Sequence, residues 1–319
     1  MQIDRYLIHS PPVRHGYLSF DWGAYDRDQA ILLRMARISG FGGVSLAVDF
    51  VGESSGIPVV LLHGGGQTRH AWGTAARALA QRGYLAVIMD SRGHGDSDWS
   101  PDVDYSMKAY VADVMSVLDH LDSAPVLIGA SMGGQIAMTT VAEHPAAARA
   151  LVLVDVTPRI DSQGRARILN FMQSHPLGFT DLHEAAEAIA AYLPHRPRPT
   201  DLSGLQRNLR LRDDGRYHWH WDQRFLAKYE PEGEAAEQRY MKAAEAIRIP
   251  TLLLRGSRSD VVTLEQLEHF RALIPHAELI DVHGAAHMLA GDRNDDFNSA
   301  LIGYLDRLSP PLRHDGEHQ

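Results

Sequence analysis

The chain has 319 residues, 45% of them hydrophobic and 22% charged, an ordinary composition for a globular protein long enough to bury an extensive core. Lys and Arg number 31 against 40 Asp and Glu, and the net charge of −9 gives no electrostatic footprint for nucleic acid or an anionic membrane. Cysteine is absent, which excludes disulfides, thiol nucleophiles and zinc–thiolate sites. The sequence shows no signal peptide and no stretch of about 18 apolar residues, so the expected location is the cytoplasm.

Short apolar runs alternate with amphipathic helices in two parts of the chain. Predicted strands cover residues 59–62, 85–89, 126–128, 151–154, 249–254 and 279–282. Predicted helices cover residues 70–82, 106–121, 136–143, 263–273 and 297–308. Runs that are apolar throughout are typical of strands buried on both faces, and helices between such strands make crossover connections. The pattern therefore predicts an α/β fold with a mostly parallel sheet flanked by helices.

Residues 157–247 lie between these two parts and follow a different pattern. They contain no comparable strand runs. One clear helix is predicted at 181–192 and a charged helical stretch at 234–246, and the proline-rich residues 194–199 cannot be helical. We therefore expect a helical insertion that lies over the sheet.

This insertion sets the expected division of the chain. The core comprises residues 31–156 and 248–308. Residues 1–30 form an N-terminal extension, which is expected to pack on the body because it is rich in aromatic residues. The Pro-rich, polar residues 309–319 are expected to form a flexible tail.

The sharpest motif is Gly-x-Ser-x-Gly at residues 129–133, between a predicted strand and a predicted helix. A strand that turns directly into a helix forces the central residue, Ser131, into a strained conformation, and the small residues on either side relieve the crowding. The Ser131 hydroxyl then projects into open space, beside helix amides that favour a developing anion. This context favours a nucleophilic serine over one that only caps a helix.

A nucleophilic serine needs a base, and the base needs an orienting group. Asp260 and His287 each follow a C-terminal strand, in the order serine, acid, histidine that such a turn predicts. Both are expected to reach the sheet edge that carries Ser131, because the ends of parallel strands meet there. Asp155 is the alternative acid and His283 the alternative base.

The glycine run at 64–66, which follows His63, is the other candidate for catalysis. Consecutive glycines let the backbone approach a substrate closely and aim N–H groups at it. The expected oxyanion hole combines the amide of Met132 with that of Gly65, or alternatively that of Gly66. His63 is expected to anchor the loop rather than to catalyse.

Five motifs in this order resemble the α/β-hydrolase superfamily, and most closely its capped branch of esterase-like and epoxide-hydrolase-like proteins. They are HGGG at 63–66, DSRGHGDS at 90–97, the turn at Ser131, Asp260 and His287. The resemblance covers residues 44–155 and 249–308. It implies the α/β-hydrolase fold, with a helical cap inserted after the sixth strand.

The resemblance also implies the site. It implies a catalytic triad of Ser131, Asp260 and His287 and a reaction without a cofactor. The sequence itself contains no pattern of metal ligands beside these motifs. Asp90 and His94 are similar to a structural turn of the family, without a catalytic role.

The serine at position 131 narrows the chemistry. Epoxide hydrolases and haloalkane dehalogenases of this branch have an aspartate there, because attack on an alkyl carbon needs a carboxylate. Serine suits an acyl carbon, so the expected activity is hydrolysis of a carboxylic ester, in a small-molecule substrate, through an acyl-enzyme. Alternatives with the same triad are hydrolysis of a lactone, macrocyclic lactones included, cleavage of a C–C bond beside a carbonyl, and perhydrolysis. The alternative from another class is a non-catalytic receptor for a small molecule.

In this architecture the substrate pocket lies between the sheet edge and the cap, so specificity residues are expected within 157–245. The candidate substrate-binding residues are aromatic, and they are Phe171, Tyr217, Trp219 and Trp221.

Overall fold

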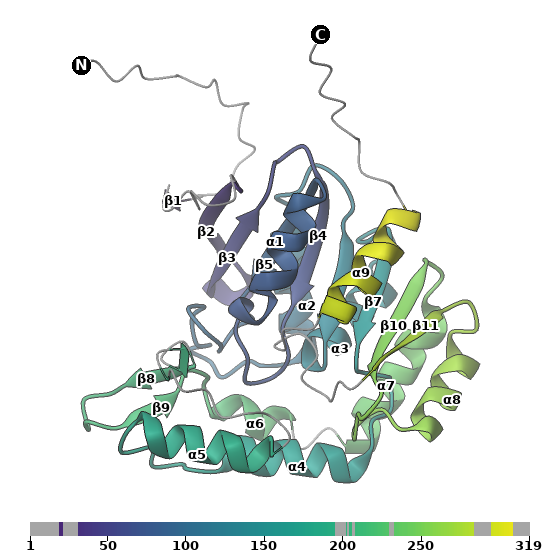
Figure 1. The fold of residues 1–319 in the computed structure, drawn as a ribbon. Helices are drawn as coiled ribbons and strands as arrows, with labels where there is room; N and C mark the ends of the chain where they lie inside the picture. The colour runs from purple at the N-terminus through teal and green to yellow at the C-terminus, as the bar shows by residue number, and fades with distance from the viewer. Residues whose placement is uncertain are drawn as a thin grey trace, which may run out of the picture.

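The structure is a computed structural model that describes residues 19–21, 31–194, 202, 204–205, 208–229, 233–283 and 295–308. Within these ranges one sheet has the strand order β1-β2-β3-β5-β4-β6-β7-β10-β11 (Figure 1). Its strands are β1 Ser19–Asp21, β2 Leu33–Ser39, β3 Ser45–Val51, β4 Ile57–Leu62, β5 Tyr84–Met89, β6 Val126–Ala130, β7 Ala150–Val154, β10 Thr251–Gly256 and β11 Glu278–Val282.

The sheet is parallel from β5 to β11, as the sequence predicts. β1, β2 and β3 extend its other edge as antiparallel strands, and β3 pairs with β5. β2 and β3 were not predicted from the sequence. β2 alternates exposed and buried residues because one of its faces meets water, so it lacks the continuous apolar run that marks the central strands.

Helices cover both faces of this sheet. α1 Gly73–Gln81, preceded by the short helix η2 Arg69–Trp72, lies with α9 Asp295–Leu308 on one face. α2 Met107–Leu118, α3 Met132–Glu143, α7 Gly233–Ala246 and α8 Leu264–Leu273 pack on the other, and η1 Phe41–Gly43 lies beside α2.

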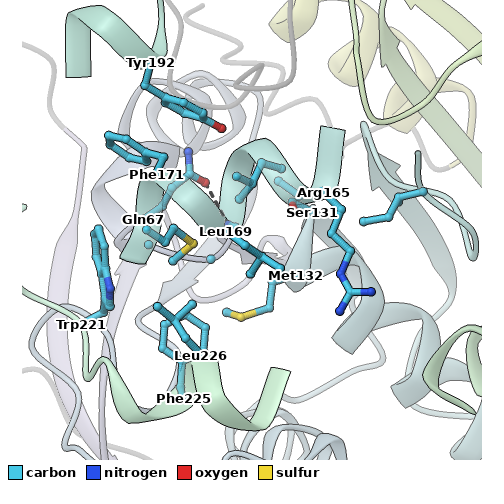
Figure 2. A pocket seen from close by; sticks show the side chains of 17 residues that line it. Gln67, Ser131, Met132, Arg165, Leu169, Phe171, Tyr192, Trp221, Phe225 and Leu226 are labelled. Carbon is cyan, nitrogen blue, oxygen red and sulfur yellow. Dashed lines mark hydrogen bonds between the residues drawn. The ribbon is translucent and has the colours of Figure 1, made fainter. Parts of the chain in front are cut away.

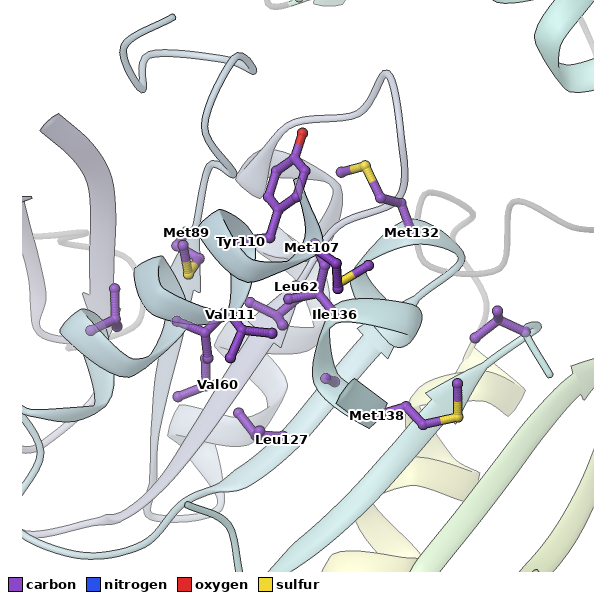
Figure 3. Packing of buried hydrophobic residues seen from close by; sticks show 14 of the residues in the cluster. Val60, Leu62, Met89, Met107, Tyr110, Val111, Leu127, Met132, Ile136 and Met138 are labelled. Carbon is purple, nitrogen blue, oxygen red and sulfur yellow. The ribbon is translucent and has the colours of Figure 1, made fainter. Parts of the chain in front are cut away.

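Successive residues of β4 explain why the central strands are apolar throughout. Val59 and Leu61 join the core under α1 and α9, whereas Val60 and Leu62 join the core under α2 and α3. Figure 3 shows the second core, in which side chains of β4, β5 and β6 meet those of α2 and α3. Two cores divided by one sheet hold the ends of the parallel strands in fixed positions.

The inserted segment follows β7, the sixth strand when the three-residue β1 is left out. It contains α4 Ser162–Gln173, α5 Leu182–Tyr192, α6 Arg224–Tyr229 and a two-stranded hairpin of β8 Leu209–Leu211 and β9 Tyr217–Trp219. These elements lie together at the bottom of Figure 1, beyond one end of the sheet.

The insertion thus contains a hairpin besides helices, and this hairpin, α4 and α6 were not predicted from the sequence. The apolar residues of α4 gather in its second half, so the helix lacks an apolar stripe along its whole length. Asp161 begins α4 as its N-cap, because its carboxylate accepts from the amides of Gln163 and Gly164 at 2.9 Å each.

No helix in the described ranges is both long and apolar enough to cross a membrane. The N-terminal extension predicted at residues 1–30 lies outside the described residues except for β1. The tail predicted at residues 309–319 lies outside them as well.

Candidate active site

Ser131 occupies the turn between β6 and α3. Its backbone has φ +48° and ψ −119°, and a positive φ is rare for a residue with a side chain. Its amide donates to the carbonyl of Val154 on the neighbouring β7 at 3.2 Å. Although Ser131 precedes the first helical residue, its hydroxyl makes no capping hydrogen bond. The Ser131 side chain therefore does not cap α3.

The glycines around Ser131 are required by close packing of β6, α3 and β4. A Cβ atom on Gly129 would collide with the carbonyl of Gly133, and a Cβ on Gly133 would collide with the carbonyl of Leu62. Gly134 is equally confined, because its Cβ would collide with Val156. Residues 129 and 133 of the motif must therefore be glycine, because the neighbouring backbone leaves no room for a Cβ atom.

A cavity of about 910 Å³, its open mouth included, lies against Ser131. Residues 64–67 of the glycine loop and residues 130–132, from the end of β6 to the start of α3, line it from the core. Side chains from the inserted segment form the rest of the described lining. Those side chains are mainly apolar, and they are Ile160, Ile168, Leu169, Phe171, Met172, Tyr192, Trp221, Phe225 and Leu226. Arg165 also lines the cavity, and in Figure 2 it lies to the right of Ser131, whereas the aromatic rings lie to the left.

Two of the four predicted substrate-binding residues line this cavity, namely Phe171 and Trp221. Trp219 lies behind the described lining, with its ring stacked on that of Trp221 at 4.7 Å between centroids. Tyr217 is also absent from that lining, and its backbone pairs with that of Phe179. The spacing of residues 217, 219 and 221 would place all three on one face of a strand, so strand alternation does not separate them. β9 ends at Trp219, and the packing of the inserted segment decides that only Trp221 of the three lines the cavity.

The loop at 64–66 lies directly against the candidate nucleophile. A Cβ on Gly64 would lie 3.4 Å from Ser131 Cβ, and one on Gly65 would lie 3.8 Å from Met132 Sδ. The Gly64 amide donates to Gln67 Oε1 at 2.9 Å, as Figure 2 also shows.

The backbone amides in this loop and at the start of α3 differ in whether they already donate a hydrogen bond within the protein. The Gly66 amide donates to His94 Nε2 at 3.1 Å, which makes Gly66 unsuitable as an oxyanion donor in this conformation. Within the described residues, the amides of Gly65 and Met132 have no acceptor. Gly65 and Met132 therefore fit the predicted oxyanion hole better than the alternative with Gly66.

Asp155 directly follows β7, next to the Ser131 turn, and is completely buried. Its backbone is also left-handed, with φ +49°. Its carboxylate accepts from the Gly256 amide at 3.0 Å and from the Ser259 hydroxyl at 2.7 Å. The Asp155 carboxylate is thus fixed at the sheet edge.

Asp260 has a different environment. Its carboxylate pairs with Arg167 of α4 at 2.7 Å, and its side chain is 32% exposed. His287, the predicted base, lies outside the described residues. His283, the alternative base, is exposed after β11.

Asp90 and His94 have the structural surroundings that the resemblance implies. The Asp90 carboxylate is buried and accepts from the Arg69 amide and the Asp96 amide, and it pairs with the Arg69 guanidinium. His94 is buried and contacts the glycine loop through Gly66. These contacts hold the turn after β5 beneath the loop.

The sheet order, the strained turn at Ser131 and the cavity above it define the class of protein, and comparison with known proteins agrees. The α/β hydrolase fold family model matches residues 57–293. The chain therefore belongs to the α/β-hydrolase fold family.

Individual relatives include hydrolases of the esterase and lipase kind. The chain is 29% identical over 269 residues to the sn-1-specific diacylglycerol lipase ABHD11 of Mus musculus, which covers 80% of this chain and 82% of the mouse protein. It is 27% identical to Esterase Rv0045c of Mycobacterium tuberculosis, with 78% and 82% covered. A crystal structure of that esterase matches with a TM-score of 0.65 at 26% identity, over 86% of this chain and 92% of that one.

The fold is also similar to that of E-2-(acetamidomethylene)succinate hydrolase, with a TM-score of 0.74 at 22% identity. The match covers 85% of this chain and 98% of that chain.

Proposed function

We propose that the protein is a serine hydrolase that cleaves carboxylic esters with an apolar acyl or alcohol group. The observation that carries this proposal is the Ser131 hydroxyl, which lies at a strained strand–helix turn, makes no capping bond and lines the cavity. The esterases and the lipase among the relatives support the reaction class. The mainly apolar lining supports an apolar substrate.

The proposed reaction has two steps. Ser131 Oγ attacks the ester carbonyl carbon while its proton passes to His287, and the amides of Gly65 and Met132 stabilise the resulting oxyanion. The C–O bond then breaks, and the alcohol leaves with the proton from His287. Water, deprotonated by His287, attacks the acyl-enzyme in the same way and releases the carboxylic acid.

The acid that orients His287 has two candidates, Asp260 from the sequence analysis and Asp155 as its alternative. The geometry favours Asp155. An orienting carboxylate works best when it is buried and held by hydrogen bonds, as Asp155 is by Gly256 and Ser259. The carboxylate of Asp260 is instead engaged by Arg167 and partly exposed to water, which screens it.

A fluorophosphonate probe tests the proposed nucleophile. The native protein should be labelled and should hydrolyse p-nitrophenyl esters, and Ser131→Ala should lose both properties while it keeps its melting temperature. A native protein that neither takes the label nor hydrolyses any ester or lactone of a panel with varied acyl length would refute the proposal.

Two further variants test the acid. Asp155→Asn should lower kcat by about 10⁴-fold, the scale seen when a triad carboxylate is replaced by its amide. Asp260→Asn should lower kcat less than 10-fold, about the scale of a change in a partly exposed ion pair. The opposite ranking would assign the acid to Asp260.

A further inference from the structure

The glycine loop is held from both sides of the cavity. Among the described side chains that bond to its backbone, His63, Gln67 and His94 belong to the core. His220 comes from the inserted segment, directly after β9, and its Nε2 donates to the Gly66 carbonyl at 3.2 Å. The inserted segment thus contacts the loop backbone as well as covering the cavity.

The hydrogen bonds of His220 define its protonation state. Its Nδ1 accepts from the Gly95 amide at 2.7 Å, so the ring can donate to Gly66 only if the proton is on Nε2. Burial lowers the pKa of His220 well below its ordinary value, and the nearby His94 and His63 lower it further. A neutral ring with Nε2 protonated satisfies both contacts.

The segment around His220 is fixed to the core. The Asp222 amide donates to the Gly93 carbonyl at 2.9 Å, and its carboxylate accepts from the Tyr105 hydroxyl at 2.5 Å. Trp221 packs directly on the loop, because a Cβ at Gly66 would lie 3.3 Å from its ring. The position of the inserted segment is therefore transmitted to Gly66 by a short chain of buried contacts.

We propose that His220 is a positioning residue: it holds the Gly66 carbonyl and thereby the loop conformation in which the Gly65 amide points at the oxyanion. This inference rests on the proposed function, since it assigns a role within the same site. Gly66 has φ +73°, and a glycine has many accessible conformations, so the loop needs external contacts to keep one of them. Through His220, the inserted segment contributes to kcat and not only to substrate binding.

Two conservative substitutions separate the two hydrogen bonds of His220. A glutamine amide can reach the position of Nε2 and keep the donor to Gly66, whereas the shorter asparagine can replace only Nδ1 as acceptor for Gly95. The matched control is His218→Gln, because His218 lies two residues away and its Nε2 contacts Asp214 instead of the loop.

Steady-state hydrolysis of p-nitrophenyl butyrate is the first readout. His220→Asn should lower kcat by about 10- to 100-fold with KM changed less than about 3-fold, since loss of one oxyanion donor costs 10²- to 10³-fold and displacement costs less. His220→Gln and His218→Gln should stay within about 3-fold of the native kcat. Equal kcat values for His220→Asn and the native protein would overturn the proposal.

Hydrogen–deuterium exchange of the peptide that spans residues 62–68 is the second readout, and it needs no activity. His220→Asn should exchange faster at this peptide than the native protein, and His220→Gln should not. If the native protein is inactive but exchange responds in this way, the proposed function fails, whereas the positioning of the loop by His220 is upheld. Unchanged exchange in His220→Asn refutes this positioning role, whatever the activity.

Discussion

Three buried histidines around the glycine loop should make the fold sensitive to acid. Ring nitrogens of His63, His94 and His220 accept backbone N–H groups from Ser91, Gly66 and Gly95 respectively. Each ring must therefore be neutral, because protonation would place two donors against each other. Burial is the main cause that lowers the pKa of all three, and it lowers that of His94 to about 3.

The direction and size of the effect follow from linkage. The ordinary pKa of histidine is about 6.5, so below this pH His94 is protonated in the unfolded chain but stays neutral in the folded protein. Because the unfolded state then binds more protons, the free energy of unfolding falls as the pH falls. The contribution of His94 is fully present at pH 7.5, and about 2 kcal/mol of it is lost by pH 5. His63 and His220 act in the same direction. Set against a total of about 5–15 kcal/mol, such a loss is easily measured.

Urea denaturation at pH 7.5, 6.5, 5.5 and 5.0 gives the free energy of unfolding of the native protein and of His94→Gln. Glutamine can still accept from the Gly66 amide but does not titrate, so the free energy of unfolding of the variant should fall by about 2 kcal/mol less than that of the native protein between pH 7.5 and 5. Burial raises the pKa of Asp49 and Asp113, which acts in the opposite direction, and the comparison cancels their effect. Parallel curves for the two proteins would refute the argument.

Three further predictions concern packing, a buried ion pair and specificity. Gly129→Ala should abolish fluorophosphonate labelling, because its Cβ would collide with the backbone of α3. The control is Gly303→Ala in α9, where the space around the glycine is open. This control should keep its labelling and raise the free energy of unfolding by about 1 kcal/mol. Asp113→Ala should lower the free energy of unfolding in urea by about 3–5 kcal/mol, because it leaves the fully buried Arg92 guanidinium without its carboxylate. Trp221→Ala should raise KM about 10-fold more for a hexanoate than for an acetate ester, since it removes apolar wall from the cavity.

Each of these predictions has a contradicting result. Full labelling of Gly129→Ala would mean that the turn tolerates a Cβ, and loss of labelling in Gly303→Ala would make the first comparison unspecific. If Asp113→Ala lowered the free energy of unfolding by less than about 1 kcal/mol, water or other groups would have to solvate the Arg92 guanidinium. An equal change of KM for both esters would place the acyl chain away from Trp221.

The sequence by itself determined the parts of the protein that depend on neighbouring residues. The central strands were predictable because both faces of β4 to β10 are buried, which demands apolar residues at successive positions. The turn at Ser131 was predictable because steric crowding between a strand and the next helix is relieved only by small residues at 129 and 133.

Only the tertiary structure decided which distant groups meet. Asp155 and Asp260 both follow core strands, and nothing in their local sequence shows that one is buried at the sheet edge while the other pairs with a helix of the insertion. Nothing in the local sequence shows that Trp221 lines the cavity while Trp219 stacks behind it. Nor does any local pattern indicate the contact of His220 with Gly66, which lies 154 residues away. Such contacts arise from the packing of the insertion on the core, and packing depends on the whole chain rather than on any short motif.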